Sequence, residues 1–195
     1  FSPLLGKFNL YNILAAVTFA KSIGISEDSI RKSLADFSGI RGRVQKVQAG
    51  QTFDVVVDYA HTADSLKKFY GVFENQRKIC VLGSCGGGRD LWKRPEMGQV
   101  ADAHCDTIIL TNEDPYDEDA QKIIEEVAKG IESHKPIVIM DRREAIARAL
   151  KEARDGDAVL ITGKGTDPYI MEAHGKKTPW DDATVAKEEL EKIID

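Results

Sequence analysis

The sequence Val57-Asp58-Tyr59-Ala60-His61-Thr62 places an acid and a histidine at the carboxyl end of a strand predicted over residues 53–58. The next predicted strand, residues 78–82, runs into the glycine cluster Gly86-Gly87-Gly88-Arg89-Asp90. In an open α/β sheet, ligands bind outside the carboxyl ends of the strands. These two segments therefore predict a ligand crevice at one edge of a sheet.

The pattern after residue 43 predicts an α/β domain. A strand-like stretch at residues 44–47 is followed by short apolar strands, at 53–58, 78–82, 107–111, 136–140 and 158–162. Helical spacing is found between and after them, at 62–73, 95–104, 118–131, 143–153 and 182–194. This alternation indicates βαβ units, and continuous apolar runs fit strands that are covered on both faces. We therefore expect a Rossmann-like α/β fold with a mainly parallel sheet and helices on both faces.

Residues 1–40 predict two helices and no strand. The first covers 9–23, with Asn9 as its expected N-cap, and the second begins at Ser26 and closes at Gly39. Such a pair cannot make a core alone. We therefore expect residues 1–40 to be a short helical segment of a preceding domain, and residues 41–195 to be the α/β domain.

Composition excludes several classes of function. The net charge is −5 without a basic stretch, which argues against a nucleic-acid partner. No run approaches the roughly 20 apolar residues of a membrane span. The chain begins with Phe1 and has no signal-peptide pattern, so we interpret it as a cytoplasmic fragment whose upstream part is absent. Three cysteines (Cys80, Cys85, Cys105) without a C-x-x-C pair predict reduced thiols.

The first two strand-end loops carry residues suited to a ligand. Asp58 is placed to accept hydrogen bonds from ribose hydroxyls, although Asp58 or Thr62 could instead cap the following helix. The glycine loop resembles a Walker A loop in spacing, but it has Arg89-Asp90 where Lys-Ser or Lys-Thr is required. Its glycines allow close backbone approach to a ligand, and the fork of Arg89 suits a carboxylate or phosphate. We expect Lys93 and Arg94 to be solvated charges at a helix start.

The third and fourth loops are rich in charge. Five of the seven residues from 113 to 119 are acidic. The helix dipole accounts for the acids at 117–119, whereas Glu113 and Asp114 lie nearest the strand end and could face a cationic substrate group. The loop Gly163-Lys164-Gly165-Thr166-Asp167 again places glycines, a cation and an acid after a strand.

Signatures of other chemistries are missing from the sequence. The histidines, at 61, 104, 134 and 174, show no paired spacing for a metal. There is no G-x-S-x-G elbow, and no cysteine–histidine dyad can be assigned.

Together these motifs resemble the Mur ligase family of peptidoglycan synthesis, over about residues 6–184. The segments that carry the resemblance are Gly6-Lys7-Phe8-Asn9-Leu10-Tyr11-Asn12, Gly42-Arg43, Asp58-Tyr59-Ala60-His61-Thr62, Gly86-Gly87-Gly88-Arg89-Asp90 with Lys93-Arg94-Pro95 and Met97-Gly98, and Gly163-Lys164-Gly165. The resemblance implies the C-terminal domain of an ATP-dependent ligase. Such a ligase adds the third stem-peptide amino acid to UDP-N-acetylmuramoyl-L-alanyl-D-glutamate through an acyl phosphate.

The resemblance also implies roles for residues. Those expected at ATP are Asn9, Asn12, Arg43, Asp58 and His61. Those expected at the incoming amino acid are Arg89, Asp114, Tyr116, Gly163 and Asp167. In this family the phosphate loop, the Mg²⁺ ligands and the nucleotide-sugar site lie in upstream domains. We therefore expect ATP and Mg²⁺ as cofactors, the UDP-muramoyl dipeptide, an amino acid and the upstream domains as partners, and no catalytic residue, metal ligand or ligase activity in this chain alone.

Departures from the family pattern bear on the substrate. Diaminopimelate-adding members carry Asp-Asn-Pro-Arg where this chain has Glu113-Asp114-Pro115-Tyr116, and Asp167 stands where the family has glutamate. An arginine-poor, acid-rich pocket suits a side chain that ends in ammonium, so lysine is favoured over diaminopimelate.

Two alternatives stay open at this point. One is another ligase of the superfamily, of the cyanophycin or folylpolyglutamate type, against which the Lys93-Arg94-Pro95 and Met97-Gly98 segment favours the peptidoglycan branch. The other is a non-catalytic nucleotide-binding module, against which Arg89 and Asp167 favour an enzyme.

Overall fold

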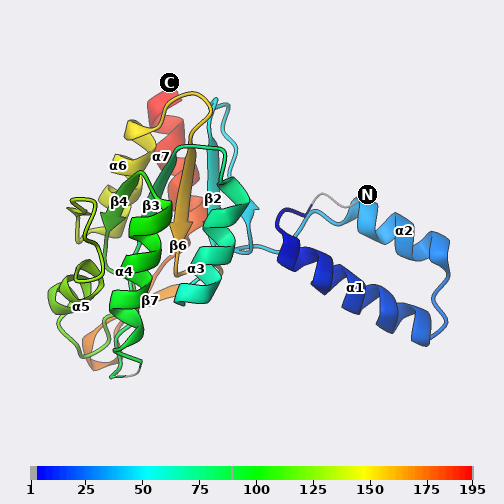
Figure 1. Cartoon of the computed structure of the whole chain (residues 1–195), viewed down its shortest axis with the longest axis horizontal. Helices are drawn as coiled ribbons and strands as arrows, with labels where there is room; N and C mark the ends of the chain where they lie inside the picture. The colour runs from blue at the N-terminus through cyan, green and yellow to red at the C-terminus, as the bar shows by residue number, and fades with distance from the viewer. Residues whose placement is uncertain (1–3, 89, 195) are drawn as a thin grey trace.

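The computed structural model describes residues 4–88 and 90–194, which form a helical hairpin and an α/β body (Figure 1). The hairpin consists of α1 (Lys7–Ser22) and α2 (Glu27–Asp36). It projects away from the body and is joined to it by one extended connection (Figure 1).

The body is built on a six-stranded sheet with the order β1-β2-β6-β3-β4-β5. Its strands are β1 (Gln45–Lys46), β2 (Asp54–Asp58), β3 (Lys78–Leu82), β4 (Thr107–Leu110), β5 (Ile137–Val138) and β6 (Ala158–Thr162). The edge strand β1 is antiparallel to β2, and all other pairings are parallel. The mainly parallel, Rossmann-like sheet predicted from the sequence is thus confirmed.

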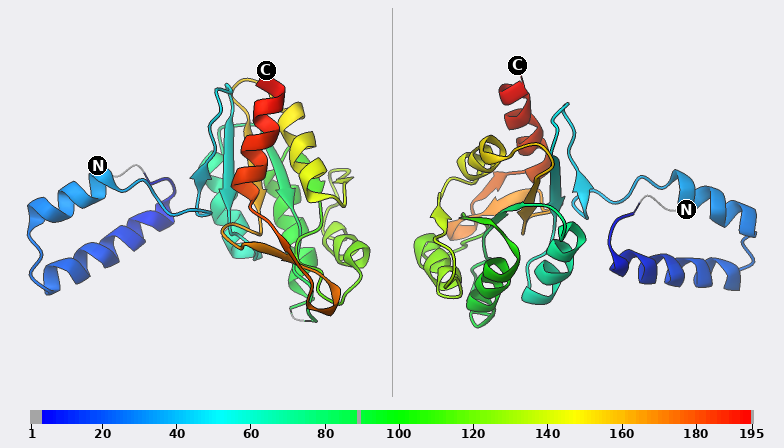
Figure 2. Two further views of the ribbon diagram at one scale, coloured as in Figure 1. Left: turned by 180° about the vertical axis from the view of Figure 1, so that it is seen from behind. Right: turned by 45° about the horizontal axis from the view of Figure 1, so that its top comes forward.

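Helices cover both faces of this sheet (Figures 1 and 2). One face carries α3 (Ala63–Tyr70), the 3₁₀ turn η1 (Gly71–Phe73), α4 (Lys93–His104) and α5 (Ala120–Ala128), and the other carries α6 (Arg142–Glu152) and α7 (Asp182–Ile194). Each face has its own apolar core, one centred on Phe69 and Leu82 and the other on Val57 and Ile161. Residues 55–57 are fully buried because alternate side chains enter the two cores.

The strand order reverses direction once. The chain runs outward from β2 through β3 and β4 to β5, and then returns through α6 to insert β6 between β2 and β3. In open α/β sheets, such a reversal leaves a crevice at the carboxyl ends of the strands.

Four helices begin after a side-chain cap, whereas α1 and α4 begin without one. Ser26, Thr62, Asp119 and Asp141 each accept a hydrogen bond from the first turn of the helix that follows. At α1, Asn9 was expected as the N-cap. The helix begins earlier, at Lys7, after Gly6 at φ 89°, and the Asn9 amide instead donates to the carbonyl of Leu5 at 2.6 Å.

The structure adds elements that the sequence pattern missed. A second, two-stranded sheet pairs β7 (Tyr169–Met171) with β8 (Lys177–Pro179) around the short turn η2 (Ala173–Gly175). Strands of three residues are too short to show a clear alternation. The strand expected over 136–140 is reduced to the two residues of β5.

Two of the three cysteines form a disulfide, so the expectation of reduced thiols was wrong for this pair. Cys80 lies in β3, and Cys105 follows the last residue of α4, with their Cα atoms 6.1 Å apart. Helix α4 runs back along β3, which brings the two residues together in one core layer. Their spacing along the sequence gave no sign of this.

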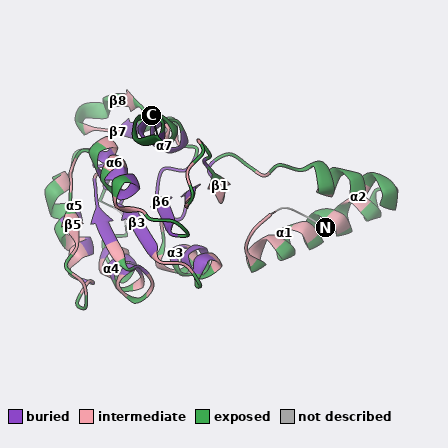
Figure 3. Ribbon diagram, turned by 90° about the horizontal axis from the view of Figure 1, so that it is seen from above, coloured by how far each residue is buried: buried purple, intermediate pink, exposed green. Residues whose placement is uncertain are grey.

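The hairpin lacks a core of its own. None of the described residues of α1 or α2 is buried, as Figure 3 shows by the absence of purple from both helices. Large apolar side chains of α1 are open to solvent, including Leu10 at 66% and Leu14 at 63% exposure. Among the described residues, no helix combines the length and the apolar character that crossing a membrane requires.

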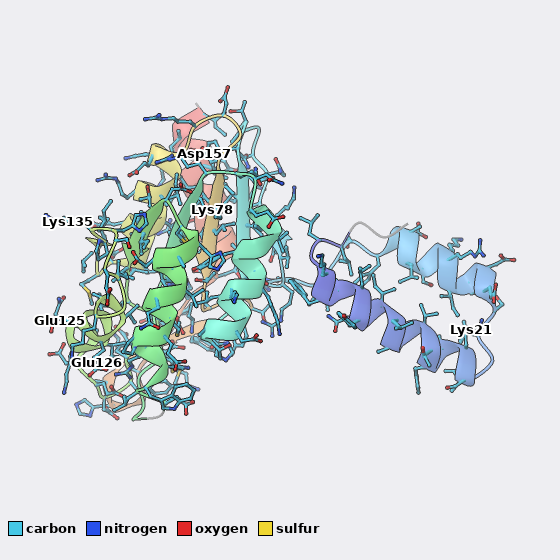
Figure 4. The ribbon with its side chains drawn as sticks, viewed as in Figure 1. Lys21, Lys78, Glu125, Glu126, Lys135 and Asp157 are labelled. Atoms are coloured by element: carbon cyan, nitrogen blue, oxygen red, sulfur yellow. A yellow bond between two sulfur atoms is a disulfide. The ribbon has the colours of Figure 1, made fainter. Side chains whose placement is uncertain are left out.

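Charged groups hold the amino-terminal edge of the sheet, where Figure 4 labels Lys78 and Asp157. The Asp157 carboxylate accepts a hydrogen bond from the Arg77 guanidinium at 2.7 Å, and Asp106 accepts one from the backbone N–H of Lys78 at 2.8 Å. Lys21 lies at the far end of the hairpin (Figure 4). An ion pair and a hydrogen bond from the backbone therefore hold the amino-terminal edge of the sheet.

Helices α4 and α5 approach so closely that their contact requires glycine. A Cβ on Gly98 would lie 2.0 Å from the carbonyl oxygen of Val127. We expect G98A to lower the free energy of unfolding by about 2 kcal/mol or more, because the helices must separate. A matched control is G71A, since Gly71 has ordinary helical angles and open space around its Cβ position. Urea unfolding would check both variants, and equal stabilities would contradict this packing.

Candidate functional site

The loops after β2, β3, β4 and β6 meet at the carboxyl edge of the sheet, as the sequence predicted. The backbone N–H of Gly86 donates to the carbonyl of Asp114 at 2.7 Å, and that of Gly163 donates to the carbonyl of Asp58 at 3.2 Å. These four loops enclose a cavity of about 270 Å³, which we call the sheet-edge cavity. Its lining residues are Tyr59, His61, Cys85, Gly86, Asp90, Lys93, Glu113, Asp114, Tyr116, Gly163 and Asp167.

A second cavity, of about 290 Å³, lies between the helical hairpin and the body, and we call it the hairpin cavity. Four of the five residues expected at ATP line it, namely Asn9, Asn12, Arg43 and Asp58. The fifth, His61, lines the sheet-edge cavity instead. The segment 58–61 therefore borders both cavities.

Asp58 ties the turn after β2 to the connection from the hairpin. One carboxylate oxygen accepts from the backbone N–H of Val44 and the other from that of Ala60, both at 2.8 Å. Burial raises the pKa of Asp58, although these two N–H groups, Arg43 and His61 oppose the shift. Of the two sequence interpretations, helix capping falls to Thr62, so Asp58 is left to face the hairpin cavity.

Aromatic and cationic side chains pack together at the turn after β2. The Arg43 guanidinium lies 4.3 Å from the centre of the Tyr59 ring, a cation–π distance. The Tyr59 and His61 rings meet edge to face at 4.8 Å, and His61 Nδ1 lies 2.8 Å from the Tyr59 carbonyl oxygen. These contacts fix the side chains that separate the two cavities.

Three of the four described non-glycine residues with positive φ angles line the two cavities, and the fourth, His174, lies in the turn η2. Val44, Asp90 and Tyr116 have positive φ angles of 46°, 52° and 52°. Such angles are costly for residues other than glycine and are common where a site imposes them. Arg89, which was expected to bind the amino acid, lies outside the described residues.

The buried side chain of Arg94 supports the glycine loop from inside the domain. The expectation that this side chain is solvated was wrong. It is buried and donates to Glu126 at 2.6 Å, to Glu118 at 2.9 Å and to the carbonyl of Cys85 at 3.1 Å. Glu126, labelled in Figure 4, comes from α5. The loop also packs on its neighbour directly, because a Cβ on Gly86 would lie 2.2 Å from the carbonyl oxygen of Pro115.

Asp114 has a cation partner within the protein. The ammonium of Lys164 lies 2.7 Å from both carboxylate oxygens of Asp114 and 3.2 Å from Asp167. Asp114 also accepts from the backbone N–H of Met171 on β7, at 2.8 Å. The charge that was expected to face a cationic substrate is therefore largely engaged by Lys164.

Glu113, the residue before Asp114, also lines the sheet-edge cavity. It is buried, its Oε2 has no hydrogen-bond partner, and a Cβ on Gly163 would collide with that oxygen. Burial raises the pKa of Glu113 to about 7, against the opposing effect of Arg142. The carboxyl group is thus divided between its neutral and charged forms near neutral pH.

Arg142 is a structural centre of the site that the sequence did not reveal. It is buried and donates to the two carboxylate oxygens of Asp182 at 2.8 and 2.7 Å, and to the carbonyls of Thr162 at 2.8 Å and Asn112 at 3.3 Å. It therefore joins the carboxyl ends of β4 and β6 to both helices of one face. An arginine in the first turn of a helix gives no sequence signal of burial.

No metal centre is formed by the part of the chain that the structure describes, since no three His, Cys, Asp or Glu side chains there are grouped to hold an ion.

The family model described as "Mur ligase, glutamate ligase domain" matches residues 42–165 of this chain. The chain therefore belongs to the Mur ligase family. The family resemblance read from the motifs is thus confirmed.

Sequence relatives agree with this assignment. The chain is 42% identical to the UDP-N-acetylmuramoyl-L-alanyl-D-glutamate–2,6-diaminopimelate ligase of Solibacter usitatus, over 97% of this chain and 39% of that protein. It is also 42% identical to the enzyme of the same name from Syntrophomonas wolfei, over 96% and 39%. The chain therefore spans about two fifths of the length of these relatives.

Solved structures show the same fold. One structure of a UDP-N-acetylmuramoyl-L-alanyl-D-glutamate–2,6-diaminopimelate ligase has a TM-score of 0.76 and 33% identity, covering 100% of this chain and 40% of that one. A pseudomurein peptide ligase type C from Methanothermus fervidus has a TM-score of 0.66 at 20% identity, covering 98% and 37%. The second likeness concerns the fold alone.

The buried pair of Arg142 and Asp182 generates a prediction about stability. We expect D182N to lower the free energy of unfolding by about 3 kcal/mol or more, because it leaves the arginine charge buried beside a neutral amide. The control is D64N, which breaks the exposed pair of Asp64 and Lys68 and should change stability by less than about 1 kcal/mol. Denaturant unfolding measures both, and a D182N effect as small as that of D64N would refute the role of Arg142.

The raised pKa of Glu113 predicts a specific pH dependence. The folded protein binds the proton more tightly than the unfolded chain, so this stabilising contribution is present at low pH and is lost as pH rises through about 7. E113Q resembles the protonated form at every pH. Between pH 5 and pH 8 we expect it to gain about 3 kcal/mol of unfolding free energy relative to the wild type. A difference that does not change with pH would show that Glu113 titrates normally.

Proposed function

We propose that the full-length protein is an ATP-dependent amide ligase that adds an amino acid to UDP-N-acetylmuramoyl-L-alanyl-D-glutamate. The observation that carries this proposal is the segment 58–61, which borders both cavities. A nucleotide in the hairpin cavity and an amino acid in the sheet-edge cavity would meet at this turn. The names of the relatives that are 42% identical support the same reaction.

The residues of the hairpin cavity suit the adenosine part of ATP. Asn9 and Asn12 offer amide groups for a base, and Asp58 and Arg43 lie where a ribose and its phosphates would follow. Bound ATP with Mg²⁺ would supply the γ-phosphoryl group that activates the glutamate carboxylate as an acyl phosphate, and ADP would leave. We assign the phosphate loop and the Mg²⁺ ligands to upstream domains.

The sheet-edge cavity would hold the incoming amino acid. In the second step its neutral amine would attack the acyl carbonyl, and phosphate would leave from the tetrahedral intermediate as the nitrogen loses a proton. The contribution of Tyr116, Gly163, Asp167 and Arg89 would be to orient the amino acid, since positioning and charge stabilisation account for much of such catalysis. Domain closure would bring this wall to the acyl phosphate.

We further propose that residues 1–40 are the end of the central ATPase domain. The exposed apolar face of α1, including Leu10 and Leu14, supports this, because such a face is usually covered in a complete protein. The chain alone would then hold one wall of the ATP site and lack ligase activity.

For the amino acid itself we propose lysine over diaminopimelate. Tyr116 stands where an arginine would bind a second carboxylate, and the described lining holds more acids than cations. Diaminopimelate is the second candidate, favoured by the names of the relatives.

The test uses the full-length protein with ATP, Mg²⁺ and the UDP-muramoyl dipeptide, and follows phosphate release with a panel of amino acids. We expect release with lysine, weaker release with diaminopimelate, and none from the chain of residues 1–195 alone. Release with diaminopimelate in preference to lysine would overturn the choice of amino acid but keep the reaction. No release with any amino acid would overturn the reaction.

A further inference from the structure

Lys164 places a buried positive charge behind the lining of the sheet-edge cavity, where it pairs with two of the lining acids. Its side chain is 1% exposed, and its ammonium lies between the carboxylates of Asp114 and Asp167. The glycines on either side have positive φ angles of 107° and 51°, so the loop after β6 turns sharply around it. The position of the charge is thus set by the backbone and by two ion pairs.

The two acids are engaged to different degrees. Asp114 is nearly buried and makes three contacts inside the protein, two with Lys164 and one with the N–H of Met171. Asp167 meets Lys164 through one oxygen at 3.2 Å, and its side chain is 39% exposed. Of this pair, Asp167 is therefore the acid that remains available to a ligand.

We infer that Lys164 is a specificity-determining residue that sets the charge of the amino-acid cavity. By neutralising Asp114, it keeps the cavity from attracting ammonium groups as strongly as its acids alone would. The preference for lysine over diaminopimelate is thereby smaller than the acids alone would give. This inference rests on the proposed ligase function and adds a residue-level cause of substrate choice to it.

Removing the charge of Lys164 and removing the charge of Asp114 should shift the preference between lysine and diaminopimelate in opposite directions. K164M leaves the acids uncompensated and should raise the ratio of kcat/KM for lysine over diaminopimelate roughly tenfold, as expected for a change of one charge near a partly shielded ligand. D114N leaves the ammonium with one partner and should lower the same ratio by a similar factor. The double variant K164M/D114N should return close to the wild-type ratio, because both charges are gone.

Control variants separate charge from structure. K164R keeps the charge and should keep the ratio within about threefold. K176M removes an exposed lysine from the β7–β8 hairpin, where it pairs with Glu172, and should leave the ratio unchanged. If K164M does not fold, D114N still tests the inference, since the amide retains an acceptor for Met171.

The experiment measures kcat/KM for both amino acids with the full-length protein at saturating ATP and UDP-muramoyl dipeptide. Opposite shifts in K164M and D114N, with K176M unchanged, would support the inference. Ratios that stay at the wild-type value in both variants would overturn it while the ligase reaction stands. An inactive wild type would overturn the ligase proposal and this inference together.

Discussion

The carboxyl edge of the sheet depends on the buried contact between Arg142 and Asp182. Desolvating two charges is costly, and the arginine offsets that cost by also donating to the carbonyls at the ends of β4 and β6. The loops that begin at those carbonyls carry Glu113, Asp114 and Lys164. One guanidinium therefore helps to position three of the charged groups at this edge.

The two cavities are bounded by parts of the molecule that differ in how deeply they are buried. The sheet-edge cavity is bounded by loops that leave fully buried strands, whereas the hairpin cavity includes helices without buried residues. In the proposed ligase, the amino-acid site would thus be preformed, while the nucleotide wall would depend on where the hairpin lies. This difference suits an enzyme that assembles its active site by domain closure.

The sequence predicted most of the fold and fewer of the side-chain contacts. The apolar runs at 55–57 and 158–161 identified buried parallel strands, because burial on both faces leaves a continuous signal. The convergence of the strand-end loops followed from that topology. The burial of Arg94 and the pairing of Lys164 with Asp114 join residues far apart in the chain, and no local pattern encodes them. The β7–β8 hairpin was missed because its strands are too short for a period to show.

The insertion of β6 between β2 and β3 has a consequence for how the domain folds. Until β6, the last strand of the sheet, arrives, β2 can pair only with β1 and β3 only with β4, so each presents one unpaired edge. Contacts of such long sequence separation slow folding, and exposed edges in the waiting chain invite intermolecular pairing. The loop after β6 supplies Gly163, Lys164 and Asp167, so the strand that completes the sheet also completes the site, and a nascent chain gains its core and its binding wall in the same late event.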